Sequence, residues 1–283
     1  MYICGTVAGT KMERFITGEK FRTLADYTYS PPAKRGDDYY HLRNTYNPDN
    51  IREGDIIYSQ TGYAQELLNE VSKIDKHVIL ITHNGDTNIN IRPPGNVIKW
   101  FTTNVNIVHP RIASIPIGLE NNIWFPDVRK KEKIIARLKE PKRHYNLMYM
   151  NHSIATNPET RQLLYDMFED KPWATSEKGS NGLGRFDQYL NNIDRHKFMI
   201  SPEGNGMDTH RLWECLYMRT IPIEKRNINN QFYTDLPICF VDEWEEITES
   251  FLNSEYDRII RQEYSLEKIT FKYWKYKILN YDK

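Results

Sequence analysis

The sequence predicts an α/β protein with two Rossmann-like domains that face a central cleft. Short apolar runs such as residues 77–82 alternate with helical patterns, as in parallel strands that are covered on both faces. This alternation occurs on both sides of a basic stretch near the middle of the chain. Polar clusters follow the apolar runs at residues 83–86, 151–153 and 203–206, and doubly wound sheets bind ligands beyond the carboxyl ends of their strands.

The domain limits follow from these patterns. Residues 1–127 are predicted to form a first α/β domain and residues 145–263 a second one, joined by a linker at residues 128–144. The linker is rich in Lys and Arg, which we interpret as a solvated helix rather than a polyanion site. Residues 264–283 are predicted to form a C-terminal helix that crosses back to the first domain.

The composition argues against several classes of protein. The 283 residues are 39% hydrophobic and 13% aromatic, which is enough to build large cores. Lys and Arg together number 38, as do Asp and Glu, and this balance argues against nucleic-acid or membrane-surface binding. No apolar run approaches the ~20 residues of a membrane span. The N-terminus lacks a signal-peptide pattern, so a cytoplasmic location is expected.

No metal site is predicted. The three cysteines, Cys4, Cys215 and Cys239, have no metal-binding spacing and are expected to be reduced core residues. In addition, no apolar strand ends in the Asp-x-Asp pair that would hold a divalent cation.

The most informative stretch is KFMISPEGNGMDTHRLWECLYMRTIPIEK at residues 197–225. It predicts a strand at 197–201, a glycine-rich turn at 202–206, a helix at 208–219 and a second strand from 221. Free amide groups at a helix N-terminus attract anions, and glycines let the backbone approach them closely. The stretch is therefore suited to binding a diphosphate.

Three ionisable residues share one face of this predicted helix, because Asp208, Arg211 and Glu214 are spaced three apart. A cation and two carboxylates beside an anion-binding turn suit a nucleoside diphosphate with its ribose. The alternative is an ordinary helix with a solvated polar face, in which Arg211 forms a salt bridge with Asp208 or Glu214. Asp208 is expected to cap the helix rather than to touch a ligand.

Several motifs of the second half occur together in one known family. They are SPEGNG at 201–206, DTHRLWE at 208–214 and TIP at 220–222, with weaker matches around 115–119 and 241–244. In these residues the chain resembles the exostosin-like glycosyltransferases from Trp100 to the C-terminus. Many members of that family have Arg where this chain has Glu203, which leaves the role of Glu203 open.

The resemblance implies a two-domain GT-B architecture and an inverting, metal-independent sugar transfer. The first domain would hold a glycan or glycoprotein acceptor and the second a nucleotide sugar, with a UDP-sugar such as UDP-xylose as the donor. No further cofactor would be required. Family members commonly carry a membrane anchor, so this chain resembles a soluble, stand-alone form.

The donor site is expected on the central motif and on the loop after residue 150. Arg211 is expected to neutralise the diphosphate with the fixed geometry of a guanidinium, and Glu214 to accept hydrogen bonds from ribose hydroxyls. His210 is expected to contact the leaving phosphate. The other candidate donor ligands are Asn151, Ser153, Arg161, Glu203, Gly204, Asn205, Gly206, Asp208 and Thr209.

The base that deprotonates the acceptor is expected on the first domain, across the cleft. Asp86 is the first candidate and His83 the second, because both follow the strongest predicted strand of that half. A carboxylate suits this role when partial burial raises its pKa, whereas the pKa of a histidine is ordinarily near neutrality. An ordinary turn at residues 84–86 is the alternative, and Glu120 and Asp38 are more remote candidates.

Two other functions fit parts of the pattern. A catalytically inactive nucleotide- or glycan-binding module of the same fold would retain both Arg211 and Glu214. A phosphorylase-like GT-B enzyme would act on a glycan with free phosphate, but the sequence has no lysine signature for pyridoxal phosphate.

Overall fold

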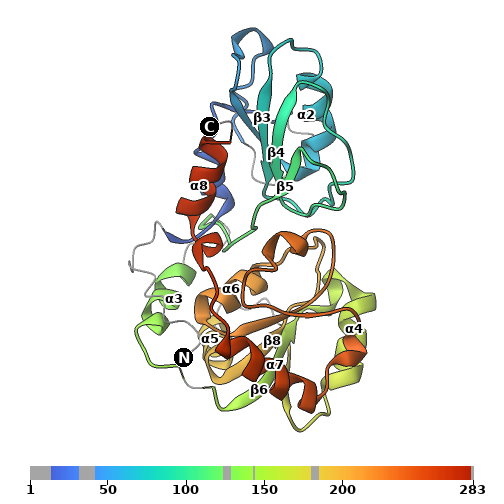
Figure 1. Cartoon of the computed structure of the whole chain (residues 1–283), viewed down its shortest axis with the longest axis vertical. Coiled ribbons are helices and arrows are strands. Elements are labelled where there is room, and N and C mark those ends of the chain that lie inside the picture. Colours follow the sequence, from blue (N-terminus) through green and yellow to red (C-terminus); the bar gives the residue numbers. More distant parts are fainter. Residues whose placement is uncertain (1–13, 32–41, 124–128, 143, 180–184, 282–283) are drawn as a thin grey trace.

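The computed structural model describes residues 14–31, 42–123, 129–142, 144–179 and 185–281. It is an α/β structure of two lobes, each built around a parallel five-stranded sheet, as Figure 1 shows. This confirms the predicted α/β class and the presence of two parallel sheets. Short 3-10 helices connect the larger elements: η2 (Pro48–Asn50), η3 (Thr61–Tyr63), η5 (Ile154–Thr156), η7 (Asn230–Tyr233), η8 (Trp244–Glu246) and η9 (Glu267–Ile269).

The first sheet is buried on both faces, which explains its apolar strands. In β3 (Val78–His83), Leu80 packs with helix α2 (Ala64–Val71), whereas Ile81 faces α1 (Gly18–Arg22) and α8 (Phe271–Leu279). The C-terminal helix α8 therefore crosses back to the first lobe, as Figure 1 shows. The other strands of this sheet are β1 (Tyr27–Thr28), β2 (Ile56–Gln60), β4 (Val97–Thr102) and β5 (Ile112–Ser114).

The strand order of the first sheet differs from a doubly wound fold. The order is β1-β2-β3-β4-β5, so the chain adds each new strand on the same side. The links from β3 to β4 and from β4 to β5 are fully described, and neither contains a helix. Ile89 and Val105 in these links pack beside α2 and cover the sheet instead. The prediction of a Rossmann-like first domain was therefore wrong in this respect.

The second sheet is parallel and has the strand order β10-β9-β8-β6-β7. The chain adds β7 on one side of β6 and then β8, β9 and β10 on the other, so the strand order reverses between β6 and β8. Tyr149 and Met199 point toward α5 (Phe186–Arg195) and α6 (His210–Met218), while Met148 and Phe198 point toward α4 (Pro158–Phe168) and α7 (Glu249–Arg261). Helix α3 (Lys130–Leu138) packs against α5 and α6. The strands are β6 (Asn146–His152), β7 (Ala174–Lys178), β8 (His196–Ile200), β9 (Ile221–Lys225) and β10 (Cys239–Val241).

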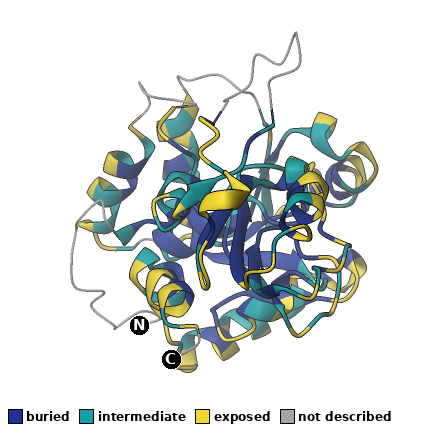
Figure 2. Ribbon diagram, turned by 90° about the horizontal axis from the view of Figure 1, so that it is seen from above, coloured by how far each residue is buried: buried dark blue, intermediate teal, exposed yellow. Residues whose placement is uncertain are grey.

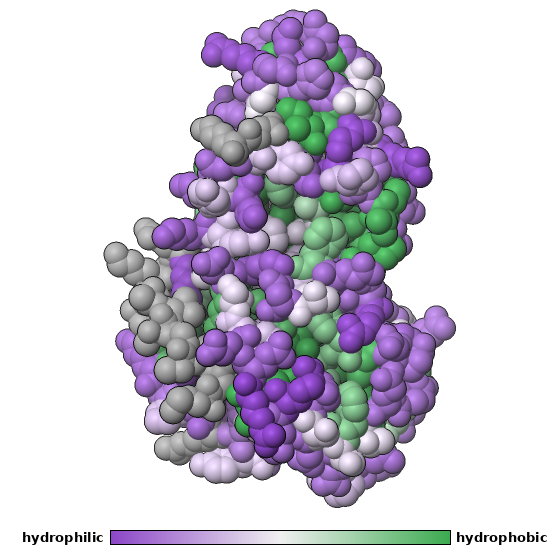
Figure 3. Space-filling view, in the orientation of Figure 1, coloured by the Kyte–Doolittle hydropathy of each residue, from purple (hydrophilic) through white to green (hydrophobic). Residues whose placement is uncertain are grey.

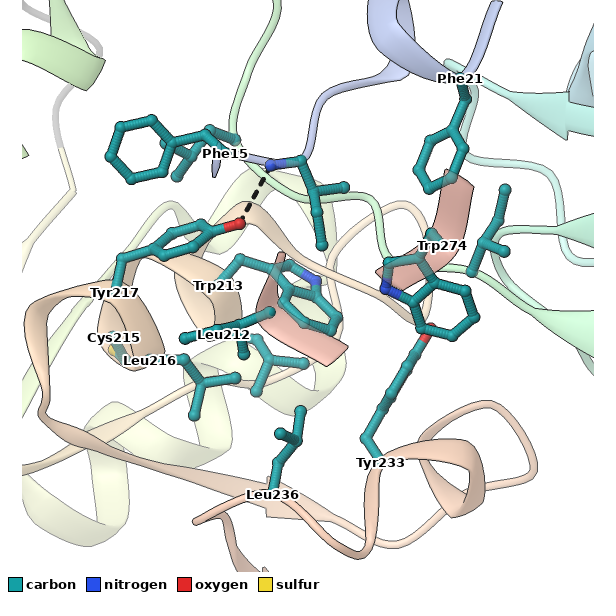
Figure 4. Close-up of a cluster of buried hydrophobic side chains, with 14 of the residues drawn as sticks. Phe15, Phe21, Leu212, Trp213, Cys215, Leu216, Tyr217, Tyr233, Leu236 and Trp274 are labelled. Atoms are coloured by element: carbon teal, nitrogen blue, oxygen red, sulfur yellow. Dashed lines mark hydrogen bonds between the residues drawn. The ribbon is translucent and has the colours of Figure 1, made fainter. Parts of the chain in front are cut away.

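One hydrophobic core joins the two lobes. Trp213 and Tyr217 of α6 meet Phe15 of the first lobe and Trp274 of α8 in this core, as Figure 4 shows. The Tyr217 hydroxyl accepts the backbone N–H of Ile16 at 3.0 Å, and the Phe15 and Tyr217 rings meet edge to face. Helix α6 is thus buried along most of its length, because it lies between the second sheet and the first lobe.

Two segments of the second lobe are set by local contacts. Residues 244–252 are divided between η8 and α7, because Thr248 caps a new helix by accepting the backbone N–H of Phe251. Residues 174–178 form strand β7, which pairs with β6. Helix α8, Phe271–Leu279, lies within the predicted range of residues 264–283 but is shorter than it.

The surface is mainly polar. Figure 2 shows buried strands at the centre with exposed residues on the outer sides of the helices, and Figure 3 shows hydrophilic residues over both lobes. Cys215 and Cys239 are buried free thiols, and Cys4 lies outside the described residues. Within the described ranges, no helix has both the length and the apolar character needed to cross a bilayer.

Candidate functional site

A pocket of about 1020 Å³ lies between the two lobes. The second lobe contributes most of its lining, and Asp86, Ile117 and Glu120 complete it from the first lobe and the segment that follows β5. The pocket lies at the carboxyl ends of β6 and β8, where the strand order reverses and where open α/β sheets bind ligands. Its volume corresponds to the upper end of the ~300–1,000 Å³ typical of small-molecule sites.

The glycines of the turn between β8 and α6 pack closely against polar side chains. A Cβ atom on Gly204 would lie 2.8 Å from Arg161 Nη2, and one on Gly206 would lie 2.8 Å from Asn104 Nδ2. The Gly204 amide donates to the Gly206 carbonyl at 3.0 Å, so this amide is occupied within the turn. Asn205, between them, is exposed and lines the pocket together with both glycines.

Arg161 of α4 holds this turn in place. It is only 5% exposed, and its guanidinium donates to the carbonyls of Glu203 at 2.9 Å, Pro202 at 3.2 Å and Ser153 at 2.9 Å. Burial and the nearby Arg211 lower the pKa of Arg161 to about 10. Arg161 lines the pocket, but the protein occupies most of its N–H groups. It therefore supports the turn and adds positive charge, instead of acting mainly as the direct ligand that was predicted.

Arg211 faces the pocket without a counter-ion. No carboxylate of the described residues lies within ion-pair distance of it, so the expected alternative, a salt bridge with Asp208 or Glu214, is not formed. Its Nε is buried and has no hydrogen-bond partner in the described part of the chain. Arg161 is close enough for the two charges to repel each other. Two adjacent guanidinium groups of this kind favour an anionic ligand.

Glu214 lies one turn further along α6 and also lines the pocket. It is 5% exposed, and its Oε2 accepts a hydrogen bond from the Tyr189 hydroxyl at 2.6 Å. Burial and the Glu214 charge raise the pKa of Tyr189, which keeps the phenol a hydrogen-bond donor. Because carboxylates are rarely buried without partners, this one is suited to binding further hydroxyl groups from a ligand.

Asp208 does not cap α6, contrary to the prediction. The N-cap residue is Thr209, and α6 begins at His210. The buried Asp208 carboxylate instead accepts the backbone N–H of Ile117 at 2.7 Å and the Trp213 indole N–H at 2.8 Å. Burial raises the pKa of Asp208 to about 7 despite these donors. Asp208 and Thr209 both line the pocket. The hydrogen bond from Ile117 to Asp208 also connects the segment after β5 to the second lobe.

Three side chains from both lobes hold residues 116–118, which we call the interlobe segment. The Pro116 carbonyl accepts from His83 Nε2 at 3.0 Å, and the Gly118 carbonyl accepts from His210 Nδ1 at 2.7 Å. Asp208 holds the amide between them. The IPIGL sequence, a weak motif in itself, thus forms the contact between the first lobe and the start of α6.

His83, the second candidate for the catalytic base, is not available for that role. Its Nδ1 accepts the backbone N–H of Asn84 at 2.7 Å while Nε2 donates to Pro116, so both ring nitrogens are occupied. The side chain is 1% exposed and is not among the described residues that line the pocket. Burial lowers the pKa of His83 to about 4. His83 therefore supports the interlobe segment.

Asp86 lines the pocket from the first lobe. Its side chain is exposed, so the partial burial expected of it is not found, and Oδ2 accepts from Asn205 Nδ2 of the second lobe at 3.3 Å. Glu120, a more remote candidate, forms an ion pair with Lys130. Asp38 lies outside the described residues.

The remaining predicted ligands lie partly outside the pocket. Asn151 lines it, and its amide donates to the Tyr149 hydroxyl at 2.7 Å. Ser153 is not part of the described lining, and its backbone carbonyl accepts a hydrogen bond from Arg161. Glu203 was wrongly expected in this site. Its side chain accepts from Asn227 at 2.9 Å and lines a separate pocket of about 370 Å³.

Several pocket residues were missed by sequence reasoning. Phe186 and Tyr189 of α5 stack with their ring centroids 5.8 Å apart, and the Lys130 ammonium lies 5.1 Å from the Phe186 centroid. Glu177 at the end of β7 accepts the Tyr149 hydroxyl at 2.6 Å. The aromatic pair at i and i+3 was the available signal, because such a pair shares one face of a helix.

The chain matches no protein-family model and no curated protein. In the described residues, no group of three or more His, Cys, Asp or Glu side chains is arranged to hold a metal ion. The described lining of the pocket includes the neighbouring guanidinium groups of Arg161 and Arg211, the buried carboxylates of Asp208 and Glu214, and the aromatic pair of α5, with Asp86 facing them from the first lobe. This arrangement is suited to a ligand that carries both an anionic group and hydroxyl groups.

Proposed function

We propose that this protein is a glycosyltransferase that moves a sugar from a nucleoside diphosphate to a hydroxyl group of a glycan. The observation that carries the proposal is Arg211, which has no ion-pair partner among the described residues and lies beside Arg161 at the switch point of the second sheet. Fixed cations at this place stabilise the charge that develops on a departing diphosphate. The motif resemblance to exostosin-like glycosyltransferases supports the same assignment.

The donor would lie on the second lobe. Arg211 and the N-terminus of α6 would bind the diphosphate, since a helix N-terminus favours anions. Glu214 would accept hydrogen bonds from the ribose hydroxyls, and the stacked Phe186 and Tyr189 would place an apolar face beside the nucleoside. The acceptor would enter from the first lobe, where Asp86 faces the pocket. In this proposal the two lobes act as the two halves of a GT-B enzyme, and transfer inverts the configuration at the anomeric carbon, as the motif resemblance implies.

We propose a UDP-sugar as the donor class, with UDP-xylose as one member, and a glycan or glycoprotein as the acceptor. In this proposal the cations of the pocket take the charge of the leaving group, so that transfer proceeds without a divalent metal ion.

Binding of nucleoside diphosphates tests the donor site directly. UDP, GDP and their sugar conjugates are added separately in a thermal-shift measurement. A diphosphate at about 100 times its Kd stabilises the folded state by about 2.7 kcal/mol. We expect Arg211→Gln to weaken diphosphate binding at least 10-fold, because a charge-assisted hydrogen bond contributes ~1.5–3 kcal/mol. The matched variant is Arg92→Gln, an exposed arginine outside the pocket, which is expected to bind like the wild type.

The outcomes separate the proposal from its alternatives. Stabilisation by a nucleoside diphosphate, with release of that diphosphate from its sugar conjugate, supports a transferase. Stabilisation without turnover by any sugar conjugate supports a nucleotide-binding module. The absence of stabilisation by every nucleotide, or equal binding by Arg211→Gln and Arg92→Gln, contradicts the donor site.

A further inference from the structure

We infer that His210, and not Asp86, takes the proton from the acceptor hydroxyl during sugar transfer. This inference rests on the proposed glycosyltransferase function. It assigns His210 a different role from the phosphate contact expected from the sequence. It depends on how the imidazole is held, on which nitrogen is free and on where the ring lies.

The hydrogen bond to Gly118 determines the tautomer of His210. His210 Nδ1 lies 2.7 Å from the Gly118 carbonyl oxygen, which can only accept a hydrogen bond. Nδ1 therefore carries the proton of the neutral ring, and Nε2 keeps its lone pair. This is the form of imidazole that can accept a proton.

The carbonyl that orients the ring is itself fixed. Gly118 has a φ of 68°, and a Cβ atom there would lie 2.4 Å from the Ile16 carbonyl oxygen. The next amide, that of Leu119, donates to the same Ile16 oxygen at 2.9 Å. The preceding amide, that of Ile117, donates to Asp208 at 2.7 Å. Gly118 is thus held on both sides, so the imidazole cannot turn without breaking its hydrogen bond.

Nε2 of His210 is free to act on a ligand. It has no hydrogen-bond partner among the described residues, and His210 is the only histidine in the described lining of the pocket. His83, close by, has both nitrogens occupied. Asp86 is exposed to solvent, and its carboxylate already accepts a hydrogen bond from Asn205.

His210 also lies where donor and acceptor would meet. It is the first residue of α6, next to the proposed diphosphate ligand Arg211, and it bonds to the interlobe segment. A ring at this boundary can reach a hydroxyl that enters from the first lobe. The charged or titratable groups that line the pocket with His210 include Arg211, Glu214, Asp208, Asp86 and the Glu120–Lys130 pair, and His83 of β3 interacts with it electrostatically.

The step balances with the groups already named. The acceptor oxygen forms a bond to the anomeric carbon as its proton moves to His210 Nε2. The bond between the anomeric carbon and the phosphate oxygen breaks, and its electron pair leaves with the diphosphate, whose charge Arg211 offsets. The imidazolium then releases the proton to solvent.

Three variants test the inference. In His210→Asn, the amide can still donate to Gly118, but no group replaces Nε2. Asp86→Asn removes the competing base. His77→Asn is the matched control, because His77 is exposed, pairs with Glu53 and lies outside the pocket. For each protein, release of UDP or GDP from UDP-xylose, UDP-glucose and GDP-fucose is measured from pH 5 to 9, with water or an added glycan as acceptor. UDP and GDP binding is measured by thermal shift.

We expect His210→Asn to lower kcat by about 100-fold to 10,000-fold, the range usual for loss of a general base. Its rate should also lose the pH dependence that the wild type shows on the acid side of its profile, because the group that accepts the proton is gone. Diphosphate binding should stay within about threefold of the wild type. Asp86→Asn and His77→Asn should both retain the acid side of the pH profile.

Each contrary result has a distinct meaning. The inference is overturned if His210→Asn keeps the wild-type rate and pH profile. It is also overturned if only KM or diphosphate binding changes, because that result would make His210 a residue that binds the donor. Loss of the acid side in Asp86→Asn alone would make Asp86 the base. If the wild type neither binds UDP or GDP nor releases them from any conjugate, the proposed function fails, and the inference fails with it.

Discussion

At the scale of single residues, buried ionisable groups connect this fold to pH. Burial lowers the pKa of His83 to about 4 and raises the pKa of Asp208 to about 7. Between pH 4 and 6.5 the unfolded chain protonates His83 while the folded chain does not, so His83 makes stability fall as the pH falls. Asp208 has the opposite effect, because there the folded chain binds the extra proton. The two contributions partly cancel in the wild type.

Substitution of one of these two groups should therefore change how the unfolding free energy depends on pH. We expect His83→Gln to reduce the slope of unfolding free energy against pH by up to about 1.4 kcal/mol per pH unit between pH 4.5 and 6. Gln is chosen because its amide can still donate to Pro116, as His83 Nε2 does. Urea unfolding at several pH values measures the slope. An unchanged slope in His83→Gln would contradict this prediction.

The site was only partly predictable from the sequence, for reasons seen in individual residues. Arg211 and Glu214 were found because their spacing on one predicted helix places both in the pocket. The roles of Arg161 and Asp208 depend on hydrogen bonds to Glu203 and Ile117, which are 42 and 91 residues away in the chain. Local patterns contain no information about such partners.

At the scale of elements, α6 has two different faces. Arg211 and Glu214 face the pocket, while Leu212, Trp213 and Leu216 belong to the core that joins the lobes. The presence of a C-terminal helix was predictable because its pattern is local, although α8 is shorter than the predicted range of residues 264–283. The cover of the first sheet was not, since Ile89 and Val105 lie in links without helical periodicity.

Helix α8 should be needed for the stability of the first lobe. Trp274 is 6% exposed, and its indole donates to the Lys268 carbonyl at 2.8 Å. We expect Trp274→Ala to cost about 3–5 kcal/mol, as for other truncations of large buried aromatic residues. Tyr276→Ala on the same helix, at a residue that is 67% exposed, should cost less than about 0.5 kcal/mol. Equal unfolding free energies for the two variants would show that packing of Trp274 in the core does not stabilise the protein.

At the scale of the whole molecule, the two lobes share polar contacts as well as a core. Buried Asn229 of the second lobe accepts the Val105 backbone N–H at 2.9 Å and the Ser114 hydroxyl at 2.8 Å. Asn104 accepts the backbone N–H of Asp208 at 2.9 Å. Separation of the lobes would leave these groups without their partners, which costs about 1–3 kcal/mol for each buried group.

The lobes should therefore unfold together. We expect a single urea transition, with the same midpoint for the loss of helical circular dichroism and for the change in tryptophan fluorescence. Hydrogen exchange should give similar opening free energies for β3 of the first lobe and β8 of the second. Two separate transitions, or early exchange of one sheet, would contradict a shared core.

The return of α8 to the first lobe has a consequence for biosynthesis. The ribosome makes Phe21, Ile81 and Phe101 long before residues 271–279, which cover them in the finished protein. Domains usually fold in order from the N-terminus as the chain emerges. Here the first lobe must keep part of its apolar face uncovered while the whole second lobe is translated. A chaperone that binds nascent apolar segments would therefore have its longest period of contact with the part of the chain that is made first.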